Sequence, residues 1–79
     1  MKMRVKLYGT LSERFPGYQP TQGMEVEIPD GATAKELLAL LEIPDSQGAV
    51  VIVKGRALKA DDKMPHGVPV NILQAIGGG

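Results

Sequence analysis

The chain has 79 residues, of which nine are basic and nine are acidic, so its formal net charge is zero. This length predicts one domain with a thin core, and the neutral charge argues against nucleic acid as a partner, because phosphates require a basic surface. The absence of cysteine excludes a disulfide framework, a catalytic thiol and a cysteine-ligated zinc site.

Two segments near the N-terminus alternate between apolar and charged residues, as half-buried strands do. Residues 1–8 carry basic side chains on the polar face, and residues 24–28 carry acidic ones. An antiparallel pairing of these segments sets basic residues opposite acidic residues, which is worth about a few tenths of a kcal/mol per pair. We therefore interpret the basic stripe as the partner of the acidic stripe and not as a phosphate-binding surface: Lys2, Arg4 and Lys6 face Glu25 and Glu27.

The connection over residues 9–23 is rich in Gly and Pro and is too long for a tight hairpin turn, so we expect an ordered loop. Phe15 is expected to anchor this loop on the edge of the core.

A helix is predicted after residue 33. Thr33 and Glu36 have the spacing of a capping box, in which each side chain accepts a hydrogen bond from the backbone N–H of the other residue. Residues 43–44, Ile-Pro, are expected to end the helix, because the residue before proline disfavours helical backbone angles. Apolar residues at helical spacing are assigned to the core: Ala34, Leu37, Leu38, Leu40 and Leu41.

Three further strands are predicted over residues 49–53, 56–58 and 68–75, with a turn-rich connection at 61–67. The resulting order, β-β-α-β-β-β, predicts an α+β fold with one helix over a mostly antiparallel sheet. We expect a folded domain over residues 1–76 and a flexible glycine tail over 77–79.

Residues for conventional catalysis are scarce. His66 is the only histidine and stands in a Pro-His-Gly turn, so it is interpreted as a solvated residue. Asp61 and Asp62 are two adjacent carboxylates before a lysine and are also assigned to a solvated loop, because hard cations need several converging oxygens. No metal site is therefore expected. No apolar run approaches the roughly 20 residues of a membrane span, so no membrane association is expected either.

Three consecutive glycines end the sequence directly after the last predicted strand. A glycine segment can enter a narrow channel and adopt backbone angles that other residues avoid. Residues 76–79 extend at most about 13–14 Å, which suffices to carry a carboxylate into the active site of another protein. A carboxylate is a poor electrophile and needs activation, for example by adenylation. A frayed end or a cloning remnant is the alternative interpretation.

In four places the chain resembles the MoaD/ThiS family of ubiquitin-like sulfur carriers. They are residues 5–11, residues 26–33 with the helix start at 36–38, residues 51–56, and the terminal Gly78 and Gly79. The molybdopterin synthase small subunit is the most similar type. Two segments differ from the family pattern: residues 65–68 replace an acidic turn, and residues 73–76 lead to three glycines without the usual proline.

The resemblance implies a β-grasp fold, in which one helix packs on a mixed four- to five-stranded sheet. It also implies a carrier that is not itself an enzyme. Gly79 is then adenylated with ATP and magnesium by an E1-like activating enzyme and becomes a thiocarboxylate. Its sulfur passes to a cofactor precursor on a synthase subunit, by the molybdopterin route ahead of the thiamin route. Gly77 and Gly78 form the slim approach to the carboxylate. No bound cofactor is implied, and we expect a cytoplasmic chain that is monomeric when free.

Leu73 and Ile76 are candidates for partner docking, with completion of the core as an equally weighted alternative. Two other functions remain open. A ubiquitin-like modifier shares the activation step but ends in an isopeptide bond to lysine. A β-grasp interaction module uses the domain surface alone, without any chemistry at the tail.

Overall fold

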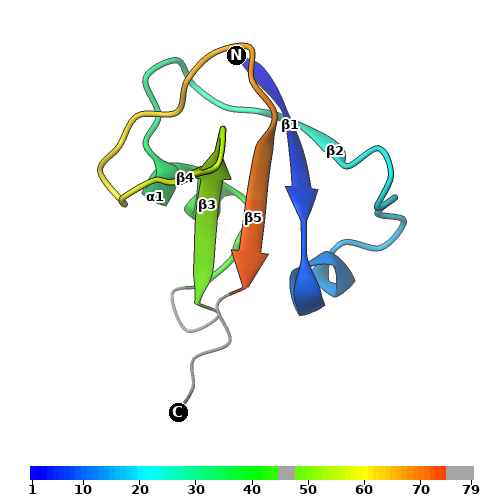
Figure 1. Cartoon of the computed structure of the whole chain (residues 1–79). Coiled ribbons are helices and arrows are strands. Elements are labelled where there is room, and N and C mark those ends of the chain that lie inside the picture. The colour runs from blue at the N-terminus through cyan, green and yellow to red at the C-terminus, as the bar shows by residue number, and fades with distance from the viewer. Residues whose placement is uncertain (45–47, 75–79) are drawn as a thin grey trace.

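The structure is a computed structural model that describes residues 1–44 and 48–74 (Figure 1). The predicted order of strands and helix is confirmed, with a short 3-10 helix in addition. The elements are β1 Lys2–Leu7, η1 Gly9–Arg14, β2 Met24–Glu27, α1 Ala34–Leu40, β3 Ala49–Val53, β4 Arg56–Ala57 and β5 Val70–Gln74.

The five strands form one mixed sheet in the order β2-β1-β5-β3-β4. Strands β1 and β5 are parallel, whereas β1–β2, β3–β5 and β3–β4 are antiparallel. The last strand therefore lies in the centre of the sheet, between the first strand and β3, as Figure 1 shows. The predicted α+β class and the mixed sheet are both confirmed.

The charged face of β1 lies opposite that of β2, as predicted. Lys2 is paired with Glu27 and Arg4 with Glu25 in the strand register. The Glu25 carboxylate lies 3.9 Å from the Lys2 ammonium and 4.0 Å from the Arg4 guanidinium. The basic stripe thus has acidic neighbours, although these exposed pairs add little to stability.

The core lies between the sheet and α1, which covers one face of the sheet (Figure 1). Alternate residues of each long strand point toward it, so β1 shows strict alternation between exposed or half-buried and buried positions. The core side chains are Met3, Val5, Leu7, Leu11, Val26, Ile28, Ala32, Ala34, Leu37, Leu41, Ile43, Val51, Val53, Met64, Val70 and Ile72.

Helix α1 begins with the predicted capping box. The Glu36 N–H donates to the Thr33 hydroxyl at 3.2 Å, and the Thr33 N–H donates to the Glu36 carboxylate at 2.9 Å. Replacing Thr33 with Ala is expected to lower the free energy of unfolding by about 1 kcal/mol. Urea denaturation followed by circular dichroism measures the change. Thr33→Ser keeps the acceptor and is the control that should stay close to the wild type.

The helix ends at Leu40, earlier than the predicted stop at residues 43–44. Glu42 adopts a left-handed φ of 58°. The Ile43 N–H donates to the Leu38 carbonyl and the Glu42 N–H to the Ala39 carbonyl. These two bonds define a Schellman motif, which satisfies the last helical carbonyls without a proline. This motif was not predictable, because Glu occupies the position where Gly is usual.

The assignment of Leu40 to the core was wrong. Its side chain is 52% exposed, whereas Leu37, one turn earlier, is fully buried. Because a seven-residue helix turns only one stripe toward the sheet, a leucine beside that stripe faces solvent.

The predicted loop over residues 9–23 contains η1, and Leu11 of this short helix is fully buried. Phe15 is half-buried against the core, as predicted. The Tyr18 hydroxyl accepts a hydrogen bond of 2.7 Å from the Leu7 N–H and so ties the loop to the end of β1. The segment closes the core at the end of the sheet where β5 also ends. No helix in the described ranges is long and apolar enough to span a bilayer.

Candidate functional site at the end of strand β5

Strand β5 is the last element before the predicted glycine tail. It ends at Gln74, which pairs with Ala49 of β3, and five residues follow in the sequence. The strand begins at Val70 and is therefore shorter than the predicted 68–75. Ile76, Gly77, Gly78 and Gly79, which the sequence singles out, lie outside the described residues. The described part of the site is the end of β5 and its surroundings.

A side-chain contact between η1 and β5 holds this strand end. The Gln74 side-chain oxygen accepts a hydrogen bond of 3.1 Å from the Thr10 N–H and another from the Thr10 hydroxyl. The two residues are 64 positions apart. Sequence reasoning missed this contact, because no periodicity or motif relates a loop threonine to a glutamine at the far end of the chain.

The sheet face turned away from α1 carries an apolar patch beside this strand end. Its members are Val50 and Ile52 of β3, Ala57 of β4 and Leu73 of β5, and we call these residues the outer-face patch. The strand register sets Val50 opposite Leu73 and Ile52 opposite Ala57. Leu73 is 39% exposed. Its side chain is therefore a surface feature and does not complete the core.

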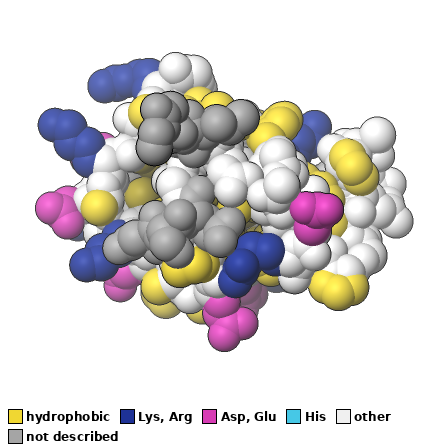
Figure 2. All heavy atoms as spheres, turned by 90° about the horizontal axis from the view of Figure 1, so that it is seen from below, with side chains coloured by type: hydrophobic (Ala, Val, Ile, Leu, Met, Phe, Trp, Pro, Cys, Tyr) yellow, Lys and Arg dark blue, Asp and Glu magenta, His cyan; other side chains and the backbone are white. Residues whose placement is uncertain are grey.

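Polar and aromatic residues border the patch along β1. Asn71 of β5 pairs with Lys6 of β1 on one side and with Ile52 of β3 on the other. The Tyr8 hydroxyl donates to the Asn71 side-chain oxygen at 3.3 Å, and the Tyr8 ring is 45% exposed. In the end view of Figure 2, the visible hydrophobic side chains are scattered among Lys, Arg, Asp and Glu side chains. An apolar surface with a lysine at its border fits a protein partner better than a small polar ligand.

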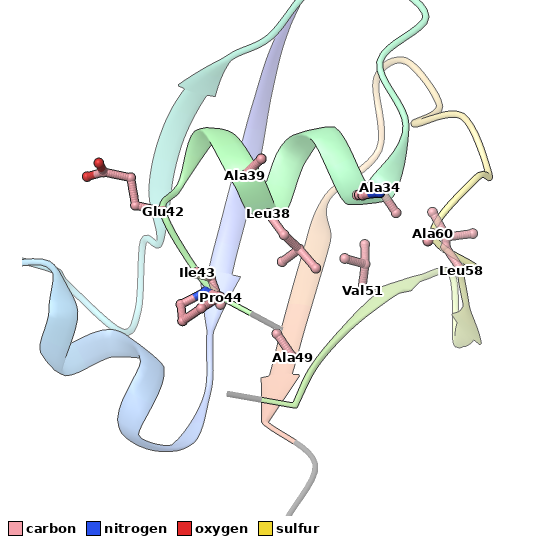
Figure 3. Close-up of a pocket in the computed structure, with 11 residues that line it drawn as sticks. Ala34, Leu38, Ala39, Glu42, Ile43, Pro44, Ala49, Val51, Leu58 and Ala60 are labelled. Carbon is pink, nitrogen blue, oxygen red and sulfur yellow. The ribbon is translucent and has the colours of Figure 1, made fainter. Parts of the chain in front are cut away.

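An open apolar groove of about 670 Å³ lies between α1 and β3, on the other face of the sheet (Figure 3). Leu38, Ala49, Val51 and Leu58 point toward it, whereas the Glu42 carboxylate points away. Its described lining contains no His, Ser or Asp side chain. The lining does include two ionisable residues, Lys35 and Glu42.

The polar candidates in the 61–67 segment are on the surface. His66 is exposed, and the Asp62 carboxylate accepts a hydrogen bond of 2.8 Å from the Lys59 N–H, which gives it a role in the turn. Among residues 1–44 and 48–74, no three His, Cys, Asp or Glu side chains are grouped to hold a metal ion.

Solved structures share this architecture from end to end. SAMP1 from Haloferax volcanii superposes with a TM-score of 0.67 at 19% identity, covering 100% of both chains. A putative molybdopterin converting factor, subunit 1, from Pyrococcus furiosus gives a TM-score of 0.70 at 19% identity, covering 96% of this chain and 99% of that one. The H. volcanii small archaeal modifier protein 1 gives 0.71 at 17% identity, covering 95% and 98%.

At these identities the likeness concerns the fold, which is the β-grasp fold predicted from the sequence. No curated protein sequence matches the chain. The ThiS family model, in contrast, matches residues 5–79, which include the whole sheet beyond the first residues of β1 and all three terminal glycines. The chain therefore belongs to the ThiS family.

Proposed function

We propose that the protein is a sulfur carrier whose Gly79 carboxylate is adenylated and then converted to a thiocarboxylate. The observation that carries this proposal is the family match, which runs through residues 77–79. The chain itself is a co-substrate and binds no cofactor; ATP and magnesium are used by an E1-like activating partner. Because the cycle uses ATP, we propose a cytoplasmic location. We also propose that the free chain is a monomer.

The proposed chemistry needs only a reachable carboxylate. One oxygen of the Gly79 carboxylate attacks the α-phosphorus of ATP, and pyrophosphate leaves. A persulfide donor then attacks the acyl carbon and expels AMP, and a second thiol cleaves the resulting acyl disulfide. That cleavage oxidises the thiol to a disulfide and leaves the thiocarboxylate on Gly79. The five residues after Gln74 span at most about 17 Å, so the domain can stay outside the partner's active site.

The decisive experiment mixes the full chain with the E1-like activating enzyme of the same organism and ATP. Release of pyrophosphate and a C-terminal acyl-adenylate are expected. After addition of a sulfur donor, intact mass should show one oxygen replaced by sulfur. Transfer of this sulfur to a molybdopterin precursor is the first acceptor to test, and transfer to a thiamin precursor is the second. Absence of any adenylate would contradict the proposal.

A ubiquitin-like modifier is the second candidate, because it uses the same activation. The same β-grasp architecture occurs in a protein described as a small archaeal modifier and in one described as a converting factor subunit, so the fold fits both functions equally. Slower-migrating conjugates that require Gly79 would favour the modifier function over the carrier function.

We propose that Leu73 docks the activating partner, together with the rest of the outer-face patch. Replacing Leu73 with Asp puts a charge into a desolvated contact and is expected to raise the KM for the carrier about 10-fold or more. Leu40→Asp, at an exposed leucine of α1 on the other side of the sheet, is the matched control and should leave KM unchanged. An unchanged KM for Leu73→Asp would exclude this face as the docking surface.

A further inference from the structure

The end of β5 is held by side-chain hydrogen bonds in addition to its strand pairing. Gln74 is paired with Ala49 through the sheet, and its side chain is held by both the N–H and the hydroxyl of Thr10. Strand ends commonly fray, because the last residue has few partners. Here the side chain of the last described strand residue is bound to a different element of the fold.

The backbone conformation of residues 8 and 9 places η1 next to the end of β5. The Tyr8 N–H donates to the Ile72 carbonyl at 3.0 Å, which continues the β1–β5 pairing up to the turn. Gly9 then takes a φ of 68°, and a Cβ at this position would lie 3.2 Å from the Gln74 side-chain oxygen. Glycine is thus suited to this position both by its backbone angle and by the close approach of Gln74.

We propose that Gln74 is a positioning residue, which fixes the point and direction at which the tail leaves the sheet; this rests on the proposed function. The segment after Gln74 has to enter the partner's active site while the outer-face patch stays docked. With the Thr10–Gln74 contact in place, the last described residue of β5 is tied to η1 by its side chain. Without this contact, Gln74 keeps its strand pairing with Ala49 but its side chain no longer ties β5 to η1.

The size of the expected loss in kcat shows whether the Thr10–Gln74 contact acts on the length of the tail or on its direction. Lengthening a free tail from five to six residues lowers the effective concentration of its end by only about 1.3-fold. A misdirected reactive group costs much more, because productive geometry depends on placement to within about 1 Å. A loss well above 1.3-fold therefore indicates an effect on direction and not on length.

The test uses Gln74→Met, which keeps the side-chain length but removes the acceptor, and Gln74→Glu, which keeps an oxygen acceptor. Both full-length variants are assayed for pyrophosphate release with the activating enzyme and ATP. We expect kcat to fall about five-fold for Gln74→Met with an unchanged KM, since the outer-face patch remains intact. Gln74→Glu should recover most of the wild-type kcat. Amide hydrogen exchange at Thr10 should accelerate only in Gln74→Met.

A glycine pair supplies a second, independent test. Gly9 and Gly67 have nearly equal positive φ angles, 68° and 70°, but nothing lies within 4 Å of a Cβ built at Gly67. Both alanine variants therefore carry similar backbone strain, and only Gly9→Ala presses on the Gln74 side chain. Gly9→Ala is expected to lower kcat as Gln74→Met does, while Gly67→Ala keeps the wild-type kcat.

The outcomes distinguish this inference from the proposed function. If the wild type is adenylated and Gln74→Met matches it within 1.3-fold or so, the positioning role is wrong and the carrier function stands. A fall in kcat that Gln74→Glu fails to restore, or that Gly67→Ala shares, also overturns the positioning role. If the wild type is not adenylated at all, both the carrier function and the positioning role are wrong.

Discussion

Deleting Gly78 and Gly79 is expected to reduce adenylation by the activating enzyme to background, at least about 100-fold below the wild type. The deletion shortens the reach of the tail by about 7 Å. Misplacing a reacting group by about 1 Å already costs up to 100-fold, so a carboxylate withdrawn by several times that distance cannot react. Pyrophosphate release measures the effect directly.

The same variant supplies its own control. The deleted residues follow β5, so the described core and the outer-face patch lose no residue. The truncated chain should unfold at the same temperature as the wild type and should act as a competitive inhibitor of wild-type adenylation. A chain that ends at residue 79 as an amide should behave in the same way. If either variant were adenylated at the normal rate, the function could not lie in the terminal carboxylate.

Replacing Leu37 with Ala is expected to remove a large part of the total stability. Leu37 is fully buried between α1 and the sheet, and such a truncation costs about 2–5 kcal/mol. A domain of this size has a free energy of unfolding of only about 4–12 kcal/mol. With an m-value near 1 kcal/mol/M for a small domain, the urea midpoint should fall by at least about 2 M. Circular dichroism at 222 nm follows the transition.

Leu40→Ala is the matched control for this effect, since it makes the same chemical change three residues later in the same helix. The side chain of Leu40 is 52% exposed, so its loss should change the free energy of unfolding by less than about 0.5 kcal/mol. Equal destabilisation by the two variants would contradict the packing of α1 described above.

The strands and the helix start were predictable because each has a local chemical signature. Alternation identified β1 and β2, a β-branched run identified β3, and the Thr33–Glu36 spacing identified the start of α1. The end of α1 was not predictable, because it depends on a left-handed φ at Glu42, and Glu gives no sequence signal for this conformation. The parallel β1–β5 pairing likewise joins the two ends of the chain and leaves no local trace.

The candidate site was predictable where composition alone is informative and unpredictable where it depends on packing. The terminal glycines stand out in any reading of the sequence. The exposure of Leu73 depends on strand register, since a shift by one residue would turn this side chain into the core. The Thr10–Gln74 contact depends on the meeting of a loop and a strand that are 64 positions apart.

The central place of β5 also has a consequence for when the sheet can form during synthesis. Its pairing with β1 and β3 joins the earliest and latest parts of the polypeptide, so the sheet cannot be completed until synthesis has passed residue 74. Pairings between distant parts of a chain form late in folding. An incompletely synthesised copy therefore lacks both the complete outer-face patch and the Thr10–Gln74 contact, so a partner that recognises both, as proposed above, would not accept it.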